Sequence, residues 1–129
     1  MTWIFLQVAK IQALHKEQIE RFGGSHGLRD MGLLESAVAR AENKAAYDDN
    51  ATIVGVGASL GWGLIKNHAF IDGNKRIGIA AMVTLLDLNG YGMTCSEEEE
   101  TAMVLRAASS ECSEDEWTAW LERSVARKT

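Results

Sequence analysis

The sequence lacks proline and has only two cysteines, Cys95 and Cys112, among its 129 residues. Two cysteines cannot build a disulfide framework, and no further Cys or His pair stands at zinc-finger spacing. The composition therefore argues against a disulfide-stapled scaffold and against a structural zinc site. We expect both side chains to be ordinary thiols in a reducing cytoplasm.

Basic charge and long apolar runs are also scarce. The formal net charge is −5, with 13 Lys and Arg against 18 Asp and Glu, which disfavours a broad basic surface for nucleic acid. No apolar run reaches the roughly 20 residues of a membrane span, and no basic segment precedes the apolar stretch at the N-terminus. We expect one cytoplasmic domain over residues 1–129, with no direct nucleic-acid or membrane partner.

Apolar residues instead recur every three to four positions along most of the chain, which predicts an all-α domain. A short extended lead-in over residues 3–6 precedes the first helix. Six helices are expected, five of them over residues 8–22, 51–67, 74–89, 97–111 and 114–127. The remaining helix, second in the chain, is capped by Asp30 and carries Leu33 to Ala41.

Polar residues mark where several of these helices begin. Asp49 or Asn50 is in place to cap the third helix. The last two each open with the pattern of a reciprocal capping box, Ser96 with Glu99 and Ser113 with Glu116.

The third and fourth helices are apolar on nearly every face, so they are expected to be a central pair. The third contains Gly55, Gly57, Gly61 and Gly63, each of which costs a helix about 1 kcal/mol unless it permits close packing. We interpret them as packing glycines, because the spacing is wrong for a dinucleotide loop and no strand precedes them. Trp117 and Trp120 are expected to pack inward, and His15 to form a structural hydrogen bond in the core or between helices.

The loop between the two central helices places cations where helix physics does not favour them. Residues 67–76 read Asn-His-Ala-Phe-Ile-Asp-Gly-Asn-Lys-Arg. Lys75 and Arg76 fall at a helix N-terminus, where a cation is unfavourable by about 0.3–1 kcal/mol unless an anion binds nearby. Gly73 lets backbone N–H groups turn inward, Arg76 can grip two oxygens, and Lys75 adds a point charge. Together they predict a cradle for a polyphosphate.

Two further side chains of the loop could act on a bound nucleotide. Asp72 beside a di- or triphosphate is a usual way to hold Mg²⁺, although it could also merely cap the helix. His68 ends the preceding helix, and a neutral imidazole can accept the proton of a hydroxyl nucleophile. Such a set suffices to transfer a phosphate-containing group from a nucleotide to an alcohol. Phe70, between the two, is expected to pin the loop into the core.

Residues 68–76 resemble the motif of the Fic/Doc family, His-x-Phe-x-(Asp/Glu/Asn)-(Gly/Ala)-Asn-(Gly/Lys)-Arg, and in particular its Doc (death on curing) branch. The likeness covers roughly residues 4–92. It includes Leu14-His15, Arg21 to Gly24, Gly27 to Asp30, Leu33 to Ala37 and the Asn89-Gly90-Tyr91 ending. Ala69 replaces the Pro common in the motif, and Ile77 stands where many relatives have Thr.

The resemblance implies a compact all-α Fic fold and the toxin of a toxin–antitoxin system. Such a toxin transfers phosphate from ATP to a Thr or Ser hydroxyl of elongation factor Tu and arrests translation. A Phd-like antitoxin would be its partner, with a disordered tail that folds onto the toxin. Lys75 indicates the kinase branch, because members with Gly at this position usually transfer AMP.

The resemblance also assigns roles to the loop residues. His68 would be the general base and Asp72 the magnesium ligand. Gly73, Asn74, Lys75 and Arg76 would bind the phosphates. The alternatives are AMP transfer by the same loop, or a non-catalytic member that binds nucleotide or protein. A zinc site on His68 and Asp72 ranks low, because no third ligand is evident.

Overall fold

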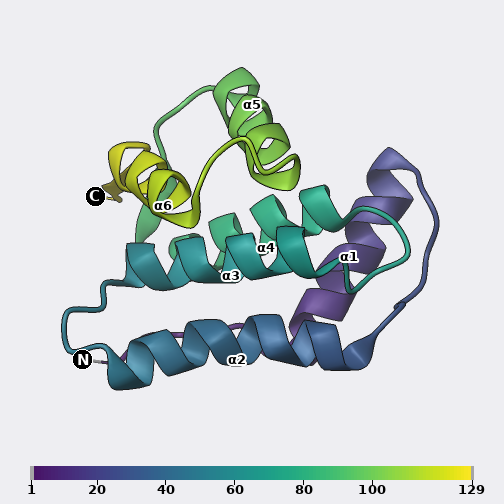
Figure 1. Ribbon diagram of the computed structural model, residues 1–129, viewed down its shortest axis with the longest axis horizontal. Coiled ribbons are helices and arrows are strands. Elements are labelled where there is room, and N and C mark those ends of the chain that lie inside the picture. Colours follow the sequence, from purple (N-terminus) through teal and green to yellow (C-terminus); the bar gives the residue numbers. More distant parts are fainter. Residues whose placement is uncertain (1, 129) are drawn as a thin grey trace.

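The computed structural model describes residues 2–128, which form six helices and one two-stranded sheet (Figure 1). The all-α class and the six helices expected from the sequence are confirmed. The elements are α1 (Val8–Phe22), α2 (Met31–Tyr47), α3 (Ile53–Asn67), α4 (Asn74–Leu88), β1 (Tyr91–Met93), α5 (Glu97–Ala108), α6 (Glu114–Arg123) and β2 (Val125–Arg127). No helix within residues 2–128 is both long enough and apolar enough to cross a bilayer.

The predicted central pair is α3 and α4, which run side by side through the middle of the molecule. Helix α3 packs against α2 on one side and against α5 and α6 on the other, while α1 packs against α4 (Figure 1). The loop that joins α3 to α4 lies at one end of the pair, close to α1. The fold thus anchors both ends of this loop in buried helices.

Glycines allow α3 and α4 to approach closely, as the sequence predicted. A Cβ atom on Gly61 would lie 3.4 Å from the carbonyl oxygen of Gly78. A Cβ atom on Gly78 would in turn lie 3.2 Å from the carbonyl oxygen of Gly61 and 2.5 Å from Cγ1 of Ile65. The two helix backbones therefore meet at these glycines.

We expect Gly78→Val to lower the free energy of unfolding by about 1–3 kcal/mol, because the added carbons must displace Ile65 and the facing backbone. Chemical denaturation measures this loss. The control is Ala102→Val at an exposed position of α5, where a β-branched residue costs only about 0.5 kcal/mol of helix propensity. Equal small losses in the two variants would contradict the close contact.

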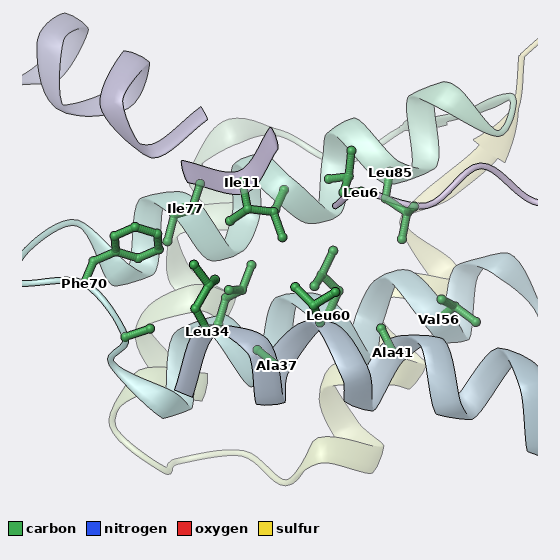
Figure 2. Packing of buried hydrophobic residues seen from close by; sticks show 14 of the residues in the cluster. Leu6, Ile11, Leu34, Ala37, Ala41, Val56, Leu60, Phe70, Ile77 and Leu85 are labelled. Atoms are coloured by element: carbon green, nitrogen blue, oxygen red, sulfur yellow. The ribbon is translucent and has the colours of Figure 1, made fainter. Parts of the chain in front are cut away.

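Two apolar clusters share the α3–α4 pair. The first lies among α1, α2, α3 and α4 and includes Phe70, which is 3% exposed and packs near Leu34 and Ile77 (Figure 2). The expected anchoring of the loop through Phe70 is therefore confirmed. The second cluster joins α3 and α4 to α5 and α6 and contains Trp117 and Trp120, both buried as expected.

The beginning of the third helix differs from the prediction. Helix α3 starts at Ile53, two residues later than expected, and its cap is Thr52, whose Oγ1 accepts a hydrogen bond from the Gly55 N–H at 3.0 Å. Asp49 and Asn50 do not cap it. They lie in the turn after α2, where the Asp48 carboxylate accepts from the N–H of Asn50. Asp49 and Asn50 thus belong to a turn that the Asp48 side chain stabilises, and the helix begins only after it.

The C-terminal part also differs from the prediction, because α6 ends at Arg123 instead of residue 127. Residues Val125–Arg127 form β2, which pairs antiparallel with β1 and places Met93 opposite Val125. The strand is too short to show a sequence period. Helix α5 ends at Ala108 rather than residue 111.

Of the two predicted capping boxes, one is complete and one is half formed. Ser113 and Glu116 form both hydrogen bonds of the box. Ser96 accepts from the Glu99 N–H, but the Glu99 carboxylate accepts from Nε1 of Trp120 at 3.0 Å instead of turning back to the cap. The hydrogen bond to Trp120, a contact between α5 and α6, therefore replaces the second bond of the capping box at Ser96.

Candidate active site

The loop between α3 and α4 begins with His68 in the left-handed region, at φ 52° and ψ 49°. This conformation costs a residue with a Cβ atom about 1–2 kcal/mol, so other contacts must hold it. Arg29 supplies them. Its Nε donates to the His68 carbonyl at 2.8 Å and its Nη2 donates to the Asn67 carbonyl at 3.3 Å. The exposed His68 side chain is thereby presented at the end of α3.

Asn74 closes the loop from within. Its Oδ1 accepts from the Phe70 N–H and its Nδ2 donates to the Phe70 carbonyl, each at 3.0 Å, and the residue is 8% exposed. The side-chain amide thus pairs with both polar backbone groups of Phe70. Its predicted contact with a phosphate stays a prediction.

His15 holds the loop from α1, in keeping with the structural role expected of it. Its Nε2 lies 2.7 Å from the Asp72 carbonyl, and its ring stacks on Phe70 with 3.9 Å between the centroids. The imidazole is 3% exposed. It therefore orders the turn just before α4 rather than facing a substrate.

The segment between α1 and α2 runs along the outer edge of the loop. The N–H groups of Arg29 and Asp30 both donate to the Ala69 carbonyl, and the Ile71 N–H donates to the Gly27 carbonyl. Leu28 and Phe70 form an antiparallel bridge. The loop is therefore fixed by backbone pairing as well as by side chains.

All six predicted site residues come together at one cavity of about 280 Å³. His68, Asp72, Gly73, Asn74, Lys75 and Arg76 line it, together with Ile71. We call it the loop cavity. The left-handed Gly73 (φ 75°) precedes α4, so the free N–H groups of the first turn of α4 lie at this cavity.

Neither cation of the loop cavity, Lys75 or Arg76, forms an ion pair within 4.0 Å in residues 2–128. Arg76 is half-buried and donates from Nη1 to the Gln18 carbonyl at 3.3 Å. Cations beside the free N–H groups of a helix N-terminus favour a bound anion, so this arrangement is suited to one.

Asp72 places an ionised carboxylate at the edge of the same cavity. Its Oδ2 accepts from the Ser25 N–H at 3.0 Å and its Oδ1 from the Gly73 N–H at 2.8 Å. These two bonds, with a smaller contribution from Arg76, hold the pKa of the Asp72 carboxyl below its ordinary value.

We expect a carbon-detected NMR titration of Asp72 to show a midpoint below the ordinary value of about 3.9. A depressed folded-state pKa stabilises the fold above the pKa of the unfolded chain, and this contribution is lost as the pH falls through the folded pKa. The Asp72→Asn variant should therefore be less stable than the parent at neutral pH. At acid pH, where the parent carboxyl is protonated, the two proteins should be equally stable. A midpoint at or above 3.9 would contradict the two hydrogen bonds.

The residues fit a nucleotide-bound magnesium ion better than a resident metal. Within residues 2–128, no cluster of three or more His, Cys, Asp or Glu side chains could hold an ion. Magnesium in nucleotide sites takes one or two protein carboxylates, and phosphate oxygens and water complete its shell. Asp72 alone suits that kind of binding.

The sequence did not connect three of the residues that shape this site to the loop, although His15 was expected to have a structural role. Arg29, Ser25 and His15 contact the loop from 39, 47 and 57 positions away in the chain. Arg29 and His15 fall within the segments that carry the family likeness, but nothing in the sequence linked any of the three to the loop.

Comparison with known proteins matches the first four helices and the loop. The model of the Fic/DOC family matches residues 5–86. The chain is 38% identical over 90 residues to "Toxin Doc" of Mycolicibacterium smegmatis, a match that covers 63% of each chain. It is 31% identical over 86 residues to "Protein kinase doc" of Escherichia phage P1, covering 67% of this chain and 68% of that one. The match thus spans less than two thirds of the mycobacterial toxin.

Proposed function

The chain belongs to the Fic/DOC family, and we propose that it is a Doc-type toxin that transfers the terminal phosphate of ATP to a Ser or Thr hydroxyl of a protein. One observation carries the proposal. A single cavity gathers His68, Asp72, Lys75 and Arg76 at the N-terminus of α4, and neither cation has a carboxylate partner in the described chain. The similarity to a protein named as a kinase supports this choice of reaction.

The residues of the loop cavity account for each part of the transfer. His68 accepts the proton of the attacking Ser or Thr hydroxyl while the hydroxyl oxygen bonds to the terminal phosphorus of ATP. The bond from that phosphorus to the bridging oxygen breaks, and ADP leaves. Lys75, Arg76 and the N–H groups that begin α4 stabilise the negative charge on the transferred group. Asp72 would hold Mg²⁺, which would supply positive charge to offset the negative charge of the phosphates.

The positive charge at the site favours an anionic substrate, such as a molecule that donates phosphate, over an uncharged substrate. The macrodipole of α4 and the two cations all favour an anion at the loop cavity. The sequence motif has Lys75 where family members that transfer AMP usually have Gly, which favours the kinase reaction. Ile77, which replaces the Thr of many relatives, is fully buried in the first core cluster and does not line the cavity.

The proposed protein substrate is elongation factor Tu, and the proposed regulator is a Phd-like antitoxin. Both follow from the family resemblance, and the similarity to a protein named as a toxin supports an antitoxin partner. Phosphorylation of that factor would arrest translation. An antitoxin that folds onto the toxin would control this activity through its own degradation.

The test is incubation of the purified protein with elongation factor Tu, magnesium and ATP, followed by intact-mass measurement of the factor. A gain of one phosphate, with label transferred from the terminal but not from the innermost phosphate of ATP, is the expected result. Transfer of the innermost phosphate would establish AMP transfer instead. ATP binding without any transfer, to this factor or to a cell extract, would favour a non-catalytic member of the family.

A further inference from the structure

Three successive backbone carbonyls at the end of α3 are bound by one short segment of the chain. Arg29 donates through Nε to the His68 carbonyl at 2.8 Å and through Nη2 to the Asn67 carbonyl at 3.3 Å. The backbone N–H groups of Arg29 and Asp30 donate to the next carbonyl, that of Ala69, at 2.8 and 2.9 Å. The two residues that precede α2 therefore hold the backbone before, at and after His68.

The position of Arg29 is itself fixed by the way α2 begins. The Oδ1 atom of Asp30, the residue that caps α2, accepts from the Leu33 N–H at 3.0 Å. The Leu33 carbonyl in turn accepts from Nδ2 of Asn67 at 2.9 Å. Side chains from the end of α3 and from the start of α2 thus bond to each other's backbone. The guanidinium of Arg29 is held at the end of α3 by this pairing and needs no substrate to place it.

The two side-chain bonds of Arg29 hold both peptide planes that flank the Cα atom of His68. The Asn67 carbonyl lies in the plane before this atom and the His68 carbonyl in the plane after it, and each peptide unit is rigid. A guanidinium presents its donors in a fixed fork, so it can hold two neighbouring carbonyls in one relative orientation. Holding both planes fixes φ and ψ of His68, and with them the direction of its Cα–Cβ bond.

We propose that Arg29 is a positioning residue for phosphoryl transfer, which sets the rate by keeping the His68 imidazole in reach of the acceptor hydroxyl. This inference rests on the proposed function, in which His68 is the general base. Arg29 does not line the loop cavity, so it acts through the His68 backbone and not on the nucleotide. Without Arg29, His68 is free to leave the left-handed region for the regions that a residue with a Cβ atom favours, and its side chain then points elsewhere.

Arg29→Met tests this role, because Met keeps an apolar stem but has neither the charge nor the donors. We expect kcat to fall about fivefold to thirtyfold, the population change that matches the cost of a left-handed residue, with the Kd for ATP unchanged. Arg29→Lys keeps the charge without the fork and should lower kcat by a smaller factor. The matched control is Arg123→Met on α6, an exposed position that does not line the loop cavity, and it should keep the parent rate.

A double variant separates positioning from a purely structural role. Initial rates with terminally labelled ATP are measured for the parent, Arg29→Met, His68→Ala and the combination, with circular dichroism on each sample to check folding. Arg29→Met should leave the rate of His68→Ala unchanged, because no imidazole remains to be positioned.

Two results would overturn the inference and leave the proposed function standing. One is a parental rate in folded Arg29→Met and Arg29→Lys. The other is an equal fold-loss from Arg29→Met with and without His68, which would mean that Arg29 acts on another part of the protein. A parent protein that transfers no phosphate at all would refute the proposed function, and this inference would fail with it.

Discussion

Replacement of His68 by Ala is expected to lower the rate of phosphoryl transfer by about 10²–10⁴-fold, the usual contribution of a general base. The His68 side chain is exposed and lines the loop cavity. The His68 backbone, just after α3, has a left-handed conformation that Arg29 holds by a hydrogen bond to the His68 carbonyl. Ala occupies that conformation at a cost similar to that of His, since both carry a Cβ atom. Stability should therefore stay within about 0.5 kcal/mol of the parent.

The measurement is the initial rate of phosphate transfer from terminally labelled ATP, with thermal unfolding followed on the same samples. His26→Ala is the matched control. His26 is also exposed and lies in the segment that runs along the loop, but it does not line the loop cavity. It should keep the parent rate. A folded His68→Ala protein with unimpaired transfer would remove His68 from the mechanism.

The loss in His68→Ala should appear in kcat rather than in the Kd for ATP. The cations and N–H groups that bind the phosphates all remain, so ground-state binding of the nucleotide is kept. A parallel loss of ATP affinity would instead mean that His68 helps to hold the nucleotide. Titration of ATP into the variant separates these two effects.

The site could be predicted from the sequence to the extent that it is contiguous. All six candidate residues fall between positions 68 and 76, and a helix on either side is enough to bring them to one cavity. The residues that fix the loop are distant in the chain. Arg29 reaches the His68 carbonyl through its side chain, and His15 reaches the Asp72 carbonyl from α1. Such contacts depend on tertiary packing, which leaves no local pattern.

The same distinction explains the fold. Helices with an apolar face or a polar cap were predicted to within a few residues, because 3.6-residue periods and caps are local. The prediction was wrong where a distant partner competed. Residues Val125–Arg127 pair with β1 instead of extending α6. The Glu99 carboxylate accepts a hydrogen bond from Trp120 instead of completing the capping box at Ser96.

Three side chains fix the backbone of the loop at which we propose that the phosphates bind. Arg29 holds the start of the loop, Asn74 its middle and His15 its end. Each contact reduces the freedom of the backbone before any nucleotide binds, so less ordering is needed in the transition state. Of the three, Asn74 is the one that bonds to the loop at both a donor and an acceptor.

We expect Asn74→Ala to lower the free energy of unfolding by about 2–4 kcal/mol. The Phe70 N–H and carbonyl would both lose their partner in a buried place, and each such group costs about 1–3 kcal/mol. Denaturant titration measures the loss. Asn43→Ala is the control, since Asn43 is exposed on α2 and its replacement should stay within about 0.5 kcal/mol of the parent.

Asn74→Asp separates the two hydrogen bonds and tests the role of this residue. The carboxylate still accepts from the Phe70 N–H, but it turns an acceptor toward the Phe70 carbonyl, which repels it in a place where water is scarce. Its stability should therefore fall as well, although the residue keeps its size. If Asn74 acted on the phosphates alone, both variants would lose affinity for tripolyphosphate at parental stability. A loss of stability in both shows that Asn74 acts by shaping the loop that presents Lys75 and Arg76.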